Sequence, residues 1–90
     1  TVTTKPFELE GESIEVNVDA KNGEVRVEVL DASGKPTRGL FGEDSQVYRA
    51  VDELRLQPKW KDSLAALKGQ VVQLRFSLNN AKLYAFQVKP

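Results

Sequence analysis

The chain has 90 residues, 40% of them hydrophobic and 29% charged, which is enough for one domain with one core and too few for two. Lys plus Arg equal Asp plus Glu at 13 each, so no basic excess is present to bind a phosphate backbone. We therefore expect no nucleic-acid partner. Because Cys and His are both absent, we expect no disulfide, metal or cofactor. No apolar run reaches bilayer length, so we expect no membrane span.

Residues 14–18 and 25–29 each alternate apolar with polar residues. Their apolar positions are Ile14, Val16, Val18, Val25, Val27 and Val29. Alternation with polar residues predicts two half-buried β-strands. Between them lies Asn22-Gly23, a strong signal for a hairpin with a type I′ turn. Such a hairpin places Val18 opposite Val27 and Val16 opposite Val29 on one face.

The middle of the chain contains one clear turn and one unclear stretch. Residues 31–36 bring together Asp, Ser, Gly and Pro, which predicts a chain reversal. Residues 37–52 are interpreted as a long loop with one short strand at 47–50.

A further strand and one helical turn follow. Leu54, Leu56, Pro58 and Trp60 alternate with polar residues, although Pro58 cannot donate to a strand ladder and predicts an edge or bulged strand. Residues 64–67 form a short apolar run that Asp62 or Ser63 can cap and that Gly69 can end. We therefore expect one short helical turn.

The last two stretches predict a closing hairpin. Their apolar positions are Val72, Leu74, Phe76, Leu78, Tyr84, Phe86 and Val88, separated by the turn residues Asn79, Asn80 and Ala81. A three-residue loop pairs Phe76 with Tyr84 and Leu74 with Phe86 in the core. With weaker strands included, the prediction is an all-β fold, a two-sheet antiparallel β-sandwich of about seven strands with one helical turn. A closed five- or six-strand barrel of the OB type is the alternative.

Several segments resemble a known bacterial module. Residues 13–20, 23–36, 60–69, 72–76 and 81–88 resemble the C-terminal β-sandwich of β-propeller glycoside hydrolases, the invertase-like family 32 type and its uncharacterised relatives. In that family the catalytic carboxylates belong to the propeller. The module usually has a cysteine-containing loop before the Trp strand, and residues 40–48 depart from it.

The resemblance implies that residues 1–90 are a single domain and a C-terminal module of a larger protein. That parent is expected to be secreted, periplasmic or at the bacterial cell surface. We expect a non-catalytic accessory module that stabilises or docks on the catalytic domain. A carbohydrate-binding module that contacts glycan directly is the alternative, and the expected partners are that catalytic domain, with carbohydrate or a homodimer as further candidates.

Five residues are the candidates for a ligand or domain interface: Phe41, Glu43, Asp44, Tyr48 and Trp60. Glu43 and Asp44 suggest a carboxylate pair or a calcium site, but adjacent loop acids are usually solvated and no EF-hand spacing is present. Trp60 could stack on a sugar, whereas its place in an alternating strand predicts a core position. Tyr48 and Phe41, in the unclear stretch, are the aromatic residues most able to face a ligand. No catalytic residues are expected.

Overall fold

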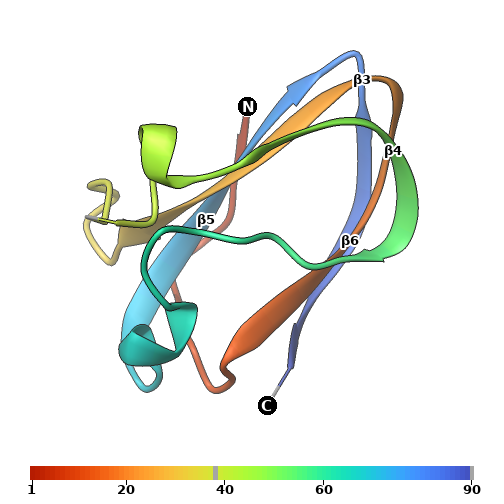
Figure 1. The fold of residues 1–90 in the computed structure, drawn as a ribbon. Coiled ribbons are helices and arrows are strands. Elements are labelled where there is room, and N and C mark those ends of the chain that lie inside the picture. Colours follow the sequence, from red (N-terminus) through yellow and green to blue (C-terminus); the bar gives the residue numbers. More distant parts are fainter. Residues whose placement is uncertain (38, 90) are drawn as a thin grey trace.

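The structure, a computed structural model, describes residues 1–37 and 39–89 (Figure 1). The described residues form six strands and two 3₁₀ helices: β1 (Val2–Thr3), β2 (Phe7–Glu8), β3 (Ser13–Asp31), η1 (Gly42–Asp44), β4 (Val47–Leu56), η2 (Leu64–Leu67), β5 (Val71–Asn79) and β6 (Lys82–Lys89). Every strand pairing is antiparallel, which confirms the predicted all-β class. Neither 3₁₀ helix is long and apolar enough to cross a membrane.

The strands form one continuous curled sheet around β3. On one side β3 pairs with β4, and on the other its first half pairs with β6 and its second half with β5. The outer edge of β5 pairs with β1 and β2. The two sides of the core therefore come from two halves of one sheet rather than from two separate sheets. Over residues 1–37 and 39–89 no strand pairing joins β4 to β1, β2 or β6, so the sheet is open.

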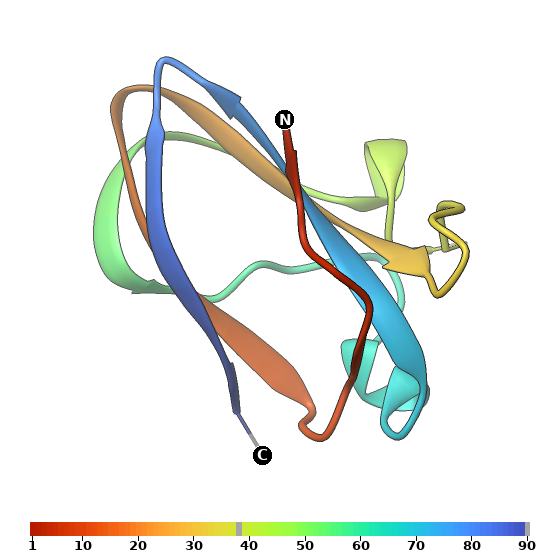
Figure 2. The ribbon, with the colours of Figure 1, turned by 180° about the vertical axis from the view of Figure 1, so that it is seen from behind.

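The sheet curls because neighbouring strands bend at the same level. The pairing of β3 with β4 shifts register between Ala20 and Glu24. Across from this point, Ala50 in β4 has φ 55° and Asn80, between β5 and β6, has φ 52°. Figures 1 and 2 show these bends together at one end of the molecule. The coordinated bend lets both halves of β3 face the same core.

The hairpin predicted at Asn22-Gly23 is wrong. The chain continues through these residues as the single strand β3, and Val27 pairs with Phe76 instead of Val18. Gly23 does not have a positive φ. A Cβ atom there would overlap the carbonyl oxygens of Asn79 and Asn80. Glycine is therefore needed for close backbone approach at the bend, which is the second common use of glycine in strands.

The predicted closing hairpin is also wrong, because β5 and β6 pair with different halves of β3 and not with each other. Phe86 pairs with Val16 rather than with Leu74. A register shift in the β3–β6 pairing leaves Tyr84 without a cross-strand partner. The side chain of Tyr84 is 61% exposed, although the alternation predicted it in the core.

The core contains most of the apolar residues that the alternation placed inside. The fully buried members include Ile14, Val16, Val18, Val25, Val27, Val29, Val72, Leu74 and Phe76. The ring of Phe86 lies 5.5 Å from that of Phe76 and 6.0 Å from that of Phe7, measured between centroids. Strands β2, β5 and β6, which come from both ends of the chain, thus meet through aromatic side chains. The side chain of Leu54, which was part of a predicted strand, lies outside the described residues.

The predicted helical turn is present as η2, packed on the core through Leu64. Ser63 caps it, since its hydroxyl accepts a hydrogen bond from the Ala65 amide at 3.2 Å. Beyond the helix, Gly69 has φ 88°, a conformation that favours glycine. The prediction of a capped turn ending at this glycine is confirmed.

The chain reversal after β3 is confirmed and is held by the carboxylate of Asp31. One oxygen accepts hydrogen bonds from the Ser33 hydroxyl at 2.6 Å, the Ser33 amide at 2.9 Å and the Lys35 amide at 3.0 Å. The Ser33 hydroxyl first, and then the Lys35 amide, lower the pKa of Asp31 below its ordinary value. The resulting stabilisation is present above the unfolded-state pKa and is lost as the pH falls through the lowered folded-state pKa.

Replacement of Ser33 by Ala is expected to raise the pKa of Asp31 toward its ordinary value, because the strongest stabiliser of the carboxylate is removed. A pH titration of the Asp31 carboxyl carbon by NMR measures this shift. The Ser63→Ala variant is the control, since Ser63 bonds Ala65 and not Asp31. An unchanged pKa of Asp31 in Ser33→Ala would contradict the assignment.

Candidate functional site

Beside the second half of β3, beyond the last residue that pairs with β4, lie two segments: the loop at residues 39–45 and residues 57–62. We call the contacts between these two segments the loop crossing. Ser45 and Trp60 form an isolated antiparallel bridge. Next to it, the Lys61 amide donates to the Asp44 carbonyl at 2.9 Å and the Asp62 amide to the Gly39 carbonyl at 3.1 Å. The two segments therefore stabilise each other beside the second half of β3, on the side where β4 no longer pairs with it.

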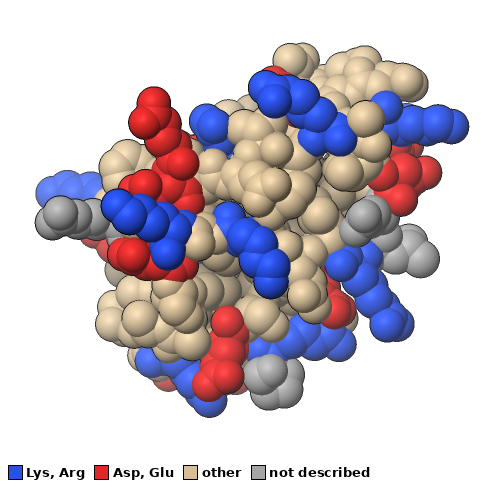
Figure 3. Space-filling view, viewed as in Figure 1, with Lys and Arg blue, Asp and Glu red and all other residues tan. Residues whose placement is uncertain are grey.

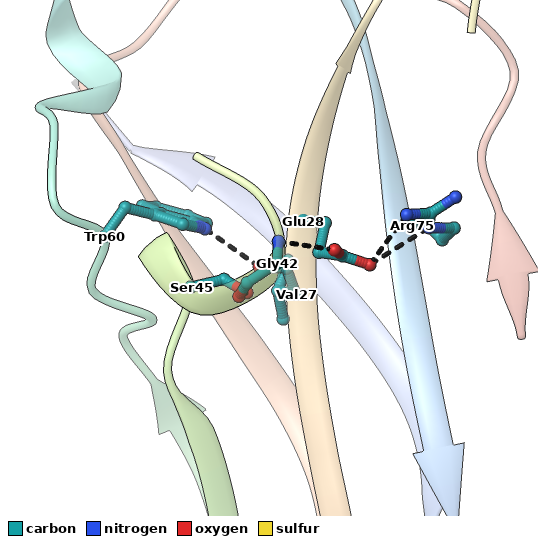
Figure 4. Close-up of polar contacts among 6 residues, drawn as sticks. All are labelled: Val27, Glu28, Gly42, Ser45, Trp60 and Arg75. Atoms are coloured by element: carbon teal, nitrogen blue, oxygen red, sulfur yellow. Dashed lines mark hydrogen bonds and ion pairs between the residues drawn. The ribbon is translucent and has the colours of Figure 1, made fainter. Parts of the chain in front are cut away.

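Trp60 fastens this crossing to the sheet. Its indole N–H donates to the carbonyl of Val27, in β3, at 2.8 Å (Figure 4). The ring is half-buried and packs against the core. Because the polar atom of the indole already has an internal partner, Trp60 contributes to the packing of the domain.

Replacing Trp60 by Phe keeps an aromatic ring and removes the indole N–H. We expect the free energy of unfolding to fall by about 1 kcal/mol, the usual net value of one hydrogen bond. Urea unfolding followed by circular dichroism measures the change, since Trp60 is the sole Trp of the chain. Phe41→Leu, at a 36% exposed aromatic, is the control and should cost less than about 0.5 kcal/mol. Equal stability of Trp60→Phe and wild type would contradict a stabilising role for this bond.

The buried carboxylate of Glu28, in β3, binds the loop at residues 39–45 to the sheet. Glu28 accepts a hydrogen bond from the Gly42 amide at 2.7 Å and pairs with Arg75 of β5, whose Nε and Nη2 atoms both lie 3.0 Å from Oε1 (Figure 4). Its residue is only 6% exposed. Alternation placed Glu28 on the solvent face, and its burial comes from the loop that passes over it. The contact with Gly42 was not predictable from strand periodicity.

The predicted acidic pair lies on η1. Glu43 is exposed and Asp44 half-buried, and Asp44 takes part in the loop crossing through its backbone carbonyl. Asp52 lies on β4, where it pairs with Asp19 of β3. Across the part of the chain that the structure describes, no group of three or more Asp, Glu, His or Cys side chains is placed to hold a metal ion.

The two remaining candidates differ in their surroundings. Tyr48, on β4, is half-buried, and its hydroxyl accepts a hydrogen bond from the Lys59 amide at 2.7 Å. Phe41 precedes η1 and is 36% exposed. The contacts between the loop at residues 39–45, β4 and residues 57–62 therefore include Asp44, Tyr48 and Trp60. The other two candidates, Phe41 and Glu43, are exposed on the same loop.

A second surface, which the sequence did not predict, surrounds β6. A hollow of about 340 Å³ extends over the first half of β3, between β4 and β6, and is lined by Glu15, Asn17, Arg55, Ala85, Phe86 and Gln87. Glu15 contacts Lys89 at 3.8 Å and the Gln57 amide at 3.4 Å. Tyr84 lies exposed beside Ala85. The hollow offers polar groups from three neighbouring strands, and the exposed Tyr84 adjoins one of its lining residues in the sequence.

The charges of the molecule are mixed. Figure 3 shows Lys and Arg side chains interspersed with Asp and Glu over the face seen in Figure 1, without one continuous patch of a single sign. The exposed ion pairs include Arg49 with Glu24 at 2.8 Å and Lys68 with Glu12 at 3.9 Å. Long-range attraction of a highly charged partner is not favoured by such a surface.

Comparison of the chain with models of known protein families, with curated proteins and with solved structures finds no match. The fold defines the class of the protein as a small antiparallel all-β domain.

Proposed function

We propose that the chain is a non-catalytic accessory module that packs against the catalytic domain of the same parent protein. The observation that supports this function best is the uncovered edge of β6. Tyr84 is 61% exposed there, and Leu83, Phe86 and Val88, which pack against the core, stay half-buried along the same strand. Apolar side chains left partly uncovered along an element are typical of surfaces that contact another protein.

The contacts of the loop crossing agree with a role in packing rather than in chemistry. The polar atoms of Trp60, Tyr48 and Glu28 are all engaged within the domain. A general base or nucleophile needs a free, accessible atom within reach of a substrate. The resemblance of the sequence to modules of propeller glycoside hydrolases supports a carbohydrate-active enzyme as the parent.

Hydrogen exchange in the parent protein and in the separate chain tests the docking. In the parent we expect slower exchange of the amides of residues 82–89, because the catalytic domain covers them. Amides of residues 31–35, at the exposed turn, serve as the internal control. Equal exchange of residues 82–89 in both proteins would overturn docking through this edge.

Direct binding of glycan is the second candidate, favoured by the hollow beside β6. Its lining includes the amides of Asn17 and Gln87 and the charged groups of Glu15 and Arg55, which suit sugar hydroxyls. Tyr84, next to this hollow in sequence, could stack on a sugar ring.

An NMR titration of the chain with soluble plant, fungal and bacterial oligosaccharides tests glycan binding. Binding at this surface predicts shifts centred on residues 15–17 and 84–87, which Asn17→Ala and Gln87→Ala should weaken. The Tyr48→Phe variant is the control, since Tyr48 lies in the loop crossing. The absence of shifts across the panel would overturn this candidate.

A further inference from the structure

β6 is an edge strand of eight residues with one side unused. It pairs with the first half of β3, and among the described strands none pairs with its other side. In an antiparallel strand about half of the backbone N–H and C=O groups point away from a given partner. A row of such groups is a template for the addition of another strand.

The side chains along this edge are also incompletely covered. Leu83, Phe86 and Val88 face the core and yet stay half-buried. On the neighbouring edge, Val2 of β1 is 48% exposed although it pairs with the fully buried Phe76. Both β6 and the segment of β1 and β2 run on the near side of the molecule in Figure 2. A strand added to β6 would shield the core-facing row from water.

The charges of β6 distinguish between two occupants. Lys82 and Lys89 stand at its ends, and no charged residue lies between them. On the β3 side, Lys82 pairs with Asp19 and the Lys89 ammonium lies 3.8 Å from Glu15, so each lysine has one acidic neighbour and its free-edge side remains open to a second. In a fully overlapped antiparallel pair of two β6 strands, Lys82 of each copy faces Lys89 of the other. Like charges directly opposite one another are destabilising, whereas Asp or Glu in these places would be stabilising. The edge therefore disfavours a second copy in this register and favours an extended segment with acidic ends.

We propose that β6 is a strand-addition site for an extended segment of a partner protein, with apolar residues at alternate positions and an acidic residue at each end. The proposal rests on the proposed accessory function, under which that segment belongs to the catalytic domain. The backbone of β6 supplies affinity, and the two lysines select the charge of the segment.

The test is a titration of the ¹⁵N-labelled chain with the blocked peptide Glu-Val-Thr-Val-Thr-Val-Thr-Glu and with its counterpart that has Lys at both ends. We expect chemical-shift changes and slower hydrogen exchange along residues 82–89. The acidic peptide should bind about tenfold more tightly, because two cross-strand charge pairs change sign. Equal affinity of the two peptides, or shifts centred elsewhere, would overturn the proposal.

The variant Lys82→Glu/Lys89→Glu should reverse the preference toward the Lys-ended peptide. Lys35→Glu/Lys59→Glu has the same net charge with both changes at exposed positions away from β6, and should keep the wild-type preference. The peptide comparison on the wild-type chain stands on its own if the β6 variant unfolds. A dimer of the chain with protected residues 82–89 would contradict the argument against a second copy.

The two proposals fail separately. If neither peptide binds while the parent protein still protects residues 82–89, strand addition is wrong and docking stands. If the acidic peptide binds while the parent leaves these amides unprotected, the strand-addition site serves a different protein and docking on the catalytic domain is wrong.

Discussion

Gly23→Ala is expected to lower the free energy of unfolding by about 3 kcal/mol, because the new methyl group meets backbone rather than flexible side chains. A Cβ atom on Gly23 overlaps the carbonyl oxygens of Asn79 and Asn80, and the carbonyl carbon of Asn80 lies 2.7 Å away. Relief requires that β3 separate from β5 at the bend, where Glu24 pairs with Asn79. Urea unfolding followed by circular dichroism gives the change.

Gly69→Ala is the matched control for this prediction. A Cβ atom on Gly69 meets nothing within 4 Å, so the substitution costs only the backbone strain of its φ of 88°, about 1 kcal/mol. Gly23→Asn separates the two interpretations of the Asn22-Gly23 pair, since a type I′ turn accepts Asn and the close approach does not. If Gly23→Ala or Gly23→Asn costs no more than Gly69→Ala, the bend does not depend on this glycine.

The alternating patterns predicted most of the strands. They did not predict that the two stretches around Asn22-Gly23 form one bent strand instead of a hairpin. Alternation identifies half-buried strands in either arrangement. In β3 the residues of the core cluster change from even numbers, ending at Ala20, to odd numbers, beginning at Val25. A hairpin turn and a bulge in one bent strand both produce that change of phase. Only the positions of Asn79 and Asn80 beside Gly23 decide between them, and these are long-range contacts.

Tyr84 shows the same limit at the level of a single residue. Its spacing from Phe86 and Val88 predicted a core position, but the register shift in the β3–β6 pairing places it outside. Only an alignment of β6 with Asn17 and Val18 reveals the shift. The exposed ring, and with it the surface around β6, could not be found from alternation alone.

The candidate site was predictable to a similar degree. The alternating strand indicated a core role for Trp60, and its ring packs against the core. Glu28 was missed because a strand pattern reports which face a side chain occupies and not what later covers that face. Its partners Gly42 and Arg75 lie 14 and 47 residues away in the sequence.

Glu28→Ala is expected to lower the free energy of unfolding by about 3 kcal/mol, the low end of the range for breaking a buried ion pair. The low end applies because the Arg75 side chain is 34% exposed and can regain water, whereas that of Glu28 is only 8% exposed. The Gly42 amide also loses its acceptor, so the loop at residues 39–45 should loosen together with the sheet contact. Urea unfolding measures the stability, and hydrogen exchange of the Gly42 amide measures the loosening.

Glu28→Gln separates charge from shape, since its amide oxygen can still accept from Gly42. We expect about half the loss seen in Glu28→Ala, with the Gly42 amide still protected. Glu24→Ala is the control at the exposed pair with Arg49, whose side chain is 73% exposed, and should cost less than about 1 kcal/mol. A Glu28→Ala variant as stable as Glu24→Ala would show that the buried carboxylate does not fasten the loop to the sheet, and the loop crossing would then depend on Trp60 and its bond to Val27.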